Sequence, residues 1–255
     1  MTEVSRPEVT SYLETDGARL SWRRVSGRGP TLVWLGGFRS DMSGTKAETL
    51  AAWAAAHGRD FLRFDYFGHG QSDGDFELGT ITHWRADVLA VLDHLTQGTA
   101  VLVGSSMGGW LGCLAALARP ERISGLLLIA PAVDFTERLL APELTREARE
   151  ALARDGVWRR PSPFDPVGYA ITRRLLEDGA RWSILPGPIS IEAPVRILQG
   201  VADAEVPWRH ALDLALALKG QDVVFSLIRD GDHRLSRPQD LDRLTAFAAE
   251  LIEGD

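Results

Sequence analysis

The chain has 255 residues, of which 45% are hydrophobic and 25% are charged, and its formal net charge is −7. This acidic balance argues against nucleic acid or an anionic membrane as the main partner, because both bind through basic patches. The length allows a large core, and α/β folds of this size often form one domain. The single cysteine, Cys113, cannot form an internal disulfide, which suits a reducing compartment.

The first segment of the chain, residues 1–15, is polar and mixed in charge. It has neither the apolar stretch of a signal peptide nor the basic amphipathic pattern of a transit segment. Because no run of about 18 apolar residues occurs, we expect no membrane span. These features predict a soluble, cytoplasmic protein.

Strand-like and helix-like segments alternate along most of the chain. The expected strands lie, in chain order, near Tyr12 and at residues 20–24, 31–35, 60–64, 100–103, 125–130, 195–199 and 223–228. The expected helices are residues 46–57, 82–95, 109–118, 208–218 and 239–252. The strand at 125–130 is so apolar that both of its faces must be covered, as they are in a parallel sheet.

Residues 134–192 interrupt this alternation and are rich in charged residues and proline. The simplest interpretation is an α/β core of residues 1–133 and 193–255, with a helical cap of residues 134–192 inserted after the sixth strand. The predicted core is a mostly parallel eight-stranded sheet with helices on both faces. An insertion at this point would cover a site at the carboxyl edge of the sheet.

A serine between two glycines follows the strand at 100–103, in the sequence Gly104-Ser105-Ser106-Met107-Gly108. Strand, sharp turn and helix in this order predict a nucleophile elbow with Ser106 at its tip, because side chains at both glycines would collide with neighbouring elements. The N–H group of Met107 would lie at the start of the helix, where unpaired donors can hold an oxyanion.

A serine hydroxyl needs a base to take its proton, and the base needs an acid to orient it. His233 follows the last strand and is the predicted base; the other histidines lie on expected helices or in a glycine-bounded loop. Asp203 directly follows the strand at 195–199 and is the predicted acid, with Asp134 and Glu205 as alternatives. The order serine, acid, histidine is the one expected for a triad carried by such a sheet.

Further candidates lie in loops and in the insertion. The N–H of Phe38, after Gly36-Gly37, is the predicted second donor of the oxyanion hole. Trp158, Trp182 and Trp208 are predicted to line a substrate pocket, with plain packing as the alternative. The glycine-rich segment 65–72 is interpreted as a tight structural turn. No cluster of His and Cys has ligand spacing, so we expect no metal and no cofactor.

With these residues placed, the chain resembles the α/β-hydrolase superfamily over essentially its whole length. The shared features are the strand order, the serine turn, the loop at 200–207 and Asp232-His233. Within the superfamily it is similar to the abhydrolase branch, which includes a mitochondrial palmitoyl-protein thioesterase also credited with hydrolysing acyl glucuronides. That closer likeness lies at residues 44–47, 63–66, 72–74, 103–111, 119–121, 156–158, 206–208 and 232–234.

The resemblance implies a serine hydrolase of carboxylic esters or thioesters, acting on a small-molecule or acylated substrate, with Ser106, Asp203 and His233 as its triad. Carbon–carbon bond hydrolysis, perhydrolysis and small-peptide cleavage stay open, because these reactions would keep the triad and differ in the pocket. A non-catalytic binding protein on this fold would most readily have lost a triad member, and none is missing.

Overall fold

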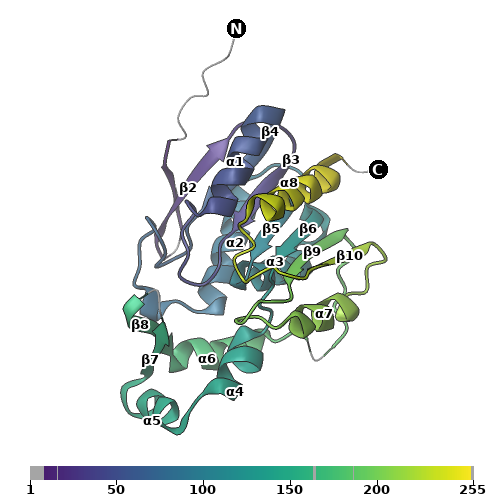
Figure 1. The fold of residues 1–255 in the computed structure, drawn as a ribbon. Helices are drawn as coiled ribbons and strands as arrows, with labels where there is room; N and C mark the ends of the chain where they lie inside the picture. Colours follow the sequence, from purple (N-terminus) through teal and green to yellow (C-terminus); the bar gives the residue numbers. More distant parts are fainter. Residues whose placement is uncertain (1–8, 16, 163–164, 186, 254–255) are drawn as a thin grey trace.

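The computed structural model describes residues 9–15, 17–162, 165–185 and 187–253. Figure 1 shows a twisted sheet with helices on both of its faces, and a smaller group of elements (α4, α5, α6, β7 and β8) below it. None of the helices in the described part of the chain combines the length and the hydrophobicity that crossing a membrane requires.

The main sheet has eight strands, in the order β1-β2-β4-β3-β5-β6-β9-β10. Strand β2 pairs antiparallel with β1 and β4, and every other neighbouring pair in this sheet is parallel. The predicted mostly parallel eight-stranded sheet is therefore confirmed. The strands are β1 (Ser11–Glu14), β2 (Arg19–Val25), β3 (Arg28–Leu35), β4 (Arg59–Phe64), β5 (Ala100–Ser105), β6 (Ile123–Ile129), β9 (Val195–Gly200) and β10 (Val223–Ile228).

Two hydrophobic cores lie on the two faces of this sheet. Because side chains alternate along a strand, Val33 and Leu35 of β3 enter one core while Leu32 and Trp34 enter the other. Helices α2 (Ile81–Leu95), α3 (Met107–Ala118) and α7 (Trp208–Ala217) pack in the first core. Helices α1 (Thr45–His57) and α8 (Pro238–Glu253) pack in the second.

The parallel register brings the ends of the central strands to one edge. Leu35 lies beside Gly104, Ser105 beside Ile129, and Ile129 beside Leu198. The loops that follow β3, β5, β6 and β9 therefore leave the sheet next to one another. Residues far apart in the sequence meet at this carboxyl edge.

The insertion between β6 and β9 covers that edge with short helices and one hairpin. Its elements are η3 (Thr136–Leu140), α4 (Ala141–Glu143), α5 (Arg146–Asp155), β7 (Val157–Ser162), β8 (Asp165–Thr172), α6 (Arg173–Gly179) and η4 (Ala180–Trp182).

The insertion is predicted to be helical, but it also contains a hairpin. Strands β7 and β8 pair antiparallel, with Arg160 opposite Tyr169. Prolines in and beside these segments predict that they are not strands. Both strands of a two-stranded ribbon are edge strands, however, and edge strands tolerate proline.

Candidate active site

Ser106 occupies the sharp turn between β5 and α3 in a backbone conformation that few residues adopt. Its φ is 55° and its ψ is −117°, outside the regions that are free of steric conflict for a residue with a side chain. Its N–H donates to the Ile129 carbonyl at 2.9 Å, and its own carbonyl accepts from the Ala132 N–H at 3.1 Å. Bonds to the end of β6 thus hold the strained residue in place.

The two glycines that flank the turn are required by close packing. A Cβ atom at Gly104 would overlap the backbone of Gly108 at the start of α3. A Cβ atom at Gly108 would overlap the carbonyl of Leu35 at the end of β3. The collisions that the sequence predicts with the helix and the neighbouring strand are confirmed.

His233 and Asp203 are joined by a hydrogen bond between His233 Nδ1 and Asp203 Oδ2, at 2.9 Å. The Asp203 carboxyl also accepts the N–H groups of Glu205 at 2.9 Å and Val206 at 2.8 Å, and the Gln199 amide at 3.1 Å. Burial acts to raise the pKa of Asp203, but the His233 imidazole and the two N–H groups outweigh it and leave that pKa below its usual value. The buried carboxylate is therefore ionised beside the imidazole.

The two alternative acids have other surroundings. Asp134 accepts hydrogen bonds from the Ser183 hydroxyl at 2.8 Å and from the Leu185 N–H at 2.9 Å, so it fixes the end of the insertion. The Glu205 carboxylate lies 3.8 Å from His233 Nε2, and its side chain is 59% exposed. Neither carboxylate contacts the Nδ1 atom that Asp203 engages.

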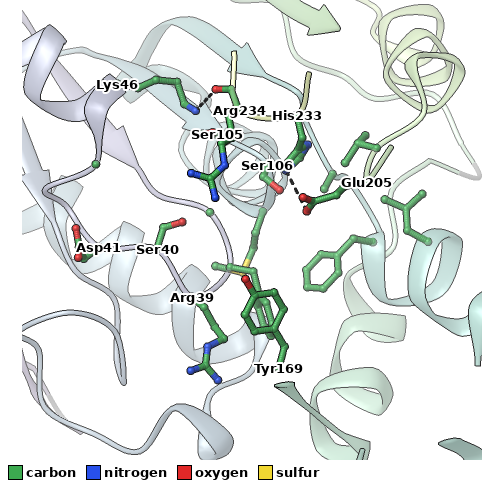
Figure 2. A pocket seen from close by; sticks show the side chains of 18 of the residues that line it. Arg39, Ser40, Asp41, Lys46, Ser105, Ser106, Tyr169, Glu205, His233 and Arg234 are labelled. Carbon is green, nitrogen blue, oxygen red and sulfur yellow. Dashed lines mark hydrogen bonds and ion pairs between the residues drawn. The ribbon is translucent and has the colours of Figure 1, made fainter. Parts of the chain in front are cut away.

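Ser106 and His233 line the same cavity, and Figure 2 shows their side chains side by side. No hydrogen bond joins the Ser106 hydroxyl to the imidazole in the described part of the chain. Such bonds are often long in enzymes without substrate and tighten when the substrate is bound. The imidazole Nε2 atom is the one left to face the serine, since Nδ1 is engaged by Asp203.

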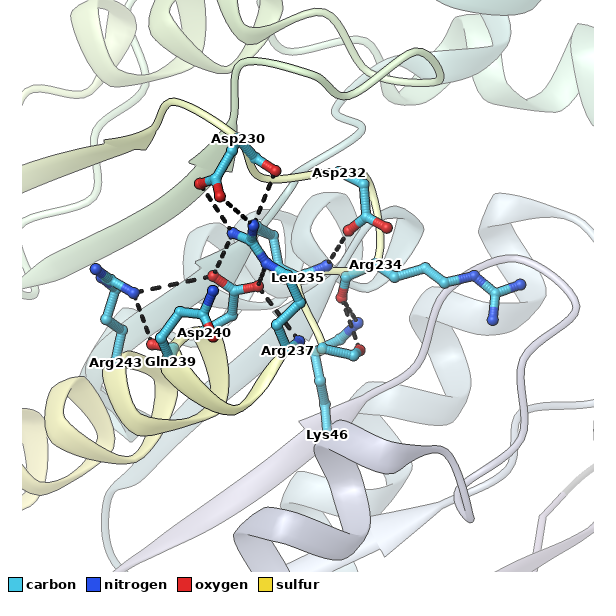
Figure 3. Close-up of polar contacts among 10 residues, drawn as sticks. Lys46, Asp230, Asp232, Arg234, Leu235, Arg237, Gln239, Asp240 and Arg243 are labelled. Atoms are coloured by element: carbon cyan, nitrogen blue, oxygen red, sulfur yellow. Dashed lines mark hydrogen bonds and ion pairs between the residues drawn. The ribbon is translucent and has the colours of Figure 1, made fainter.

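The loop that carries His233 is anchored on two sides (Figure 3). Arg237 forms ion pairs with Asp230 at 2.6 Å and with Asp240 at 2.7 Å. On the other side, the Lys46 ammonium donates to the Arg234 carbonyl, next to the histidine. Burial lowers the pKa of Lys46 to about 8. These contacts tie the histidine loop to α8 and α1.

The central cavity has a volume of about 590 Å³ and two chemically different linings. The apolar lining comes from the end of β6, the insertion and the acid loop: Ala132, Phe135, Leu139, Leu140, Ile171 and Val206. Most of the polar lining comes from the segment after β3 and the histidine loop (Arg39, Ser40, Asp41, Lys46, Arg234 and Ser236), and Arg160 of the insertion and Glu205 of the acid loop add two charged side chains to the other side. In Figure 2, Ser40, Asp41 and Lys46 lie on the side opposite Glu205.

The two expected oxyanion donors both belong to residues that line the cavity, Phe38 and Met107. Met107 is the first residue of α3, and the first N–H groups of a helix have no partner within it. Gly37 lies against Ser106, because a Cβ atom built on it would be 3.4 Å from the Cβ of Ser106. The loop after β3 therefore passes directly beside the serine.

The three tryptophans predicted to line a substrate pocket are not among the residues of this cavity. Trp158 pairs with Ile171 in the hairpin and packs on the core. Trp182 donates from its indole to the Thr82 hydroxyl at 2.8 Å. Trp208 begins α7 and lies under the Arg209 guanidinium. The structure places all three elsewhere.

Sequence reasoning missed other residues that line the cavity. Arg160 and Tyr169 come from the unforeseen hairpin, so no pattern in the sequence pointed to them. Lys46 also lines the cavity. It lies in segment 44–47, which shares the family resemblance but contains no catalytic motif. Within the described residues, no group of three His, Cys, Asp or Glu side chains is placed to hold a metal ion.

Comparison with known protein families and curated proteins gives clear matches. The model of a family described as serine aminopeptidase, S33, matches residues 31–175. The mitochondrial palmitoyl-protein thioesterase ABHD10 of Mus musculus is 36% identical over 237 residues, which are 92% of this chain and 79% of that protein. Its Bos taurus counterpart is 34% identical over 98% of this chain and 79% of its own length.

Solved structures match over nearly the whole chain. A protein from Agrobacterium vitis S4 that is assigned as a hydrolase has a TM-score of 0.92 at 43% identity, and the match covers 97% of this chain and 100% of that one. The mouse α/β hydrolase domain-containing protein 10 has a TM-score of 0.88 at 35% identity, covering 96% and 98% of the two chains.

Proposed function

We propose that this chain, which belongs to the serine aminopeptidase S33 family of α/β hydrolases, cleaves carboxylic esters or thioesters through a covalent acyl-enzyme on Ser106. The observation that carries the proposal is the 2.9 Å bond between His233 and a buried Asp203, made at the rim of the cavity into which the strained Ser106 turn opens. This arrangement supplies a nucleophile, a base and an acid at one edge of the sheet.

In the proposed mechanism, His233 Nε2 takes the proton of the Ser106 hydroxyl while the serine oxygen attacks the acyl carbon. Asp203 keeps the proton of the neutral ring on Nδ1 and stabilises the imidazolium that forms. The N–H groups of Met107 and Phe38 donate to the oxyanion of the tetrahedral intermediate. His233 then gives its proton to the leaving oxygen or sulfur as the bond to the acyl carbon breaks.

The second half of the reaction repeats these steps with water. His233 takes a proton from a water molecule, whose oxygen attacks the acyl-enzyme, and the serine leaves with that proton. The products are a carboxylic acid and an alcohol or thiol. Every proton transfer uses the same imidazole.

The two linings of the cavity suggest how a substrate is oriented. We assign the acyl chain to the apolar lining, which includes Leu140 and Ile171 of the insertion, and the leaving group to the polar lining beside Ser40 and Lys46. In this proposal residues 134–192 act as a cap that selects the acyl chain, while residues 1–133 and 193–255 form the core that holds the triad.

Removal of an N-terminal amino acid from a small peptide is a second candidate. The family description names an aminopeptidase, and two carboxylates, Asp41 and Glu205, line the cavity where an α-ammonium group would need a partner. Esters and thioesters take precedence because the curated relatives are named thioesterases.

The test is hydrolysis of three matched series (acyl esters, acyl thioesters and aminoacyl anilides) by the wild type and by Ser106→Ala. We expect turnover of esters or thioesters and a loss of at least about three orders of magnitude in kcat for the variant. Faster cleavage of anilides than of esters would favour the aminopeptidase. Equal turnover by both proteins would contradict a serine mechanism.

The cytoplasmic location expected from the sequence stays a prediction, while the curated relatives are named mitochondrial. Fractionation of cells that express the full chain tests it, and recovery in the soluble cytoplasmic fraction is the expected result. Recovery within an organelle would contradict it.

A further inference from the structure

The loop that passes beside Ser106, residues 36–42, contains a strained tight turn. The Ser40 N–H donates to the Gly37 carbonyl at 3.1 Å, which closes a four-residue turn. The third residue of that turn, Arg39, has a φ of 58°, whereas Phe38 before it does not have a positive φ. This pattern is that of a type II turn, which strongly favours glycine at the third position. An arginine there must be held by its surroundings.

His69 holds the backbone of this arginine. Its Nε2 atom accepts the Arg39 N–H at 3.2 Å, and its Nδ1 atom lies 3.1 Å from the Phe67 carbonyl, which can only accept a hydrogen bond. Nδ1 must therefore carry the proton, and Nε2 is left as the acceptor. The ring is 3% exposed and packs edge-on against Phe76 and Trp84. Burial lowers its pKa to about 4, so the imidazole is neutral near neutral pH.

Residues at the end of β4 and directly after it hold the rest of the loop 36–42, at positions that do not have a positive φ. Tyr66 donates from its hydroxyl to the Gly36 carbonyl at 3.3 Å. Asp65 accepts the Met42 N–H at 2.7 Å, and Arg63 donates to the Met42 carbonyl at 3.0 Å. Between these anchors, His69 accepts the N–H of the strained peptide of the turn, while the Arg39 guanidinium lies over the Phe76 and Tyr169 rings. The segment after β4 thus acts as a template for the loop after β3.

We propose that His69 is a positioning residue, whose neutral imidazole fixes the Phe38–Arg39 peptide and so places the Phe38 N–H for the oxyanion of the reaction. The inference rests on the proposed function, since it assigns that N–H to the intermediate. The ψ of Phe38 and the φ of Arg39 rotate the same peptide. The Phe38 N–H lies on the preceding peptide, which shares the Phe38 Cα atom with the peptide that His69 holds. If Arg39 relaxes to a negative φ, the held peptide turns over, that anchor at the Phe38 Cα is lost, and the donor shifts next to Ser106.

The experiment is a cycle of variants at the two ends of this hydrogen bond. His69→Phe keeps an aromatic ring for packing but removes the acceptor, whereas His69→Gln keeps an acceptor oxygen near the position of Nε2. Each is made with Arg39 and with Arg39→Gly, because glycine adopts a positive φ without being held. Leu244→Ala, on the buried face of α8, serves as a remote variant of reduced stability.

With Arg39 present, we expect His69→Phe to lower kcat about 10- to 100-fold with KM changed less than about threefold, a fraction of the effect of deleting an oxyanion donor. His69→Gln should stay within about fivefold of the wild type. With glycine at position 39, His69→Phe should lower kcat less than about fivefold relative to the Arg39→Gly variant alone. If His69→Phe does not fold, His69→Ala takes its place in the cycle.

An equal loss of kcat from His69→Phe with arginine and with glycine at position 39 would overturn the inference. A loss of that kind would come from reduced stability, which does not depend on the φ of residue 39. A loss in Leu244→Ala as large as that in His69→Phe would also overturn it. Failure of the proposed function is a separate result, in which the wild type and Ser106→Ala have the same turnover. Ser106-dependent turnover with no sensitivity to residue 39 would remove only the role of His69.

Discussion

The sheet edge and the cap meet at one cavity, but they are held in different ways. Ser106 and Asp203 follow β5 and β9, two strands whose residues are all buried. The cap hairpin packs Ile171 into the core, and its outer residues also form ion pairs with exposed partners, such as Arg160 to Glu143 at 2.8 Å. Exposed ion pairs stabilise weakly, whereas buried strands are costly to disturb. From this difference we expect the sheet edge to be the more rigid region, suited to chemistry, and the cap to be the more adaptable one, suited to substrate choice.

The largest expected effect is on catalysis, from replacing the predicted acid that follows β9. Asp203→Asn should lower kcat about 10³- to 10⁴-fold with little change in KM, because an amide does not hold the imidazole in the required tautomer. Glu205→Gln makes the same chemical change in the same loop and should alter kcat less than about fivefold. Steady-state kinetics on one ester measures both. Similar losses in the two variants would contradict the assignment of Asp203.

A smaller but still large effect is expected on folding. Gly108→Ala places a methyl group against the Leu35 carbonyl and should lower the free energy of unfolding by about 3 kcal/mol or more. Gly112→Ala, one turn later in α3, meets only ordinary contacts at 3.5 Å or more. It should be neutral or stabilising by about 0.5–1 kcal/mol, because alanine is the better helix former. Urea unfolding of both variants tests whether the sheet edge is as tightly packed as described.

The third effect is a pH dependence of stability that arises at the edge of the sheet. The pKa of His69 is lowered to about 4 in the folded chain, so between pH 6.5 and 4 the unfolded chain binds a proton that the folded chain does not. The contribution of His69 to stability should therefore fall by about 1–3 kcal/mol as the pH drops through this range. Asp87, whose pKa is raised to about 7 by burial, contributes with the opposite sign, so the comparison of variants isolates the part that belongs to His69.

His69→Gln should lose this contribution, whereas His94→Gln, at an exposed histidine of α2, should keep it. Urea unfolding at pH 7 and pH 4.5 gives the difference for each protein. An unchanged dependence in His69→Gln would show that another group is responsible.

The smallest effect is expected on the cap side. Ile171 lines the cavity from β8, and Ile171→Ala should raise KM for long-chain esters about 5- to 10-fold through the loss of apolar contact. The acetyl ester is the internal control, since its chain is too short to need that contact. A large loss of kcat on the acetyl ester would mean that the cap also positions the catalytic groups.

The sheet could be predicted from the sequence because its signals are local. Apolar strands such as residues 125–130 and the glycine-flanked Ser106 carry their structure in their own spacing. Chain order then placed Asp203 and His233 at consecutive strand ends, and the structure joins them by a hydrogen bond. These features depend little on distant contacts.

The cap and the loop at 36–42 could not be predicted in this way. The hairpin that brings Tyr169 to the cavity depends on pairing between two proline-containing segments, and its sequence has no alternating pattern. The bond from Arg39 to His69 joins residues 30 positions apart. The sequence places Trp158 and Trp182 at the pocket only because they lie in the insertion. In the fold, Trp158 packs on the core and Trp182 donates to the Thr82 hydroxyl, and neither contact can be read from the sequence.

The most direct test of the central claim is to trap the acyl-enzyme by rapid quenching with an activated ester, followed by peptide mass spectrometry. The account predicts one acyl group per chain, on Ser106, which is lost in Ser106→Ala and retained in Ser105→Ala, at the buried serine that ends β5. An acyl group on another residue, or one that survives Ser106→Ala, would contradict the account.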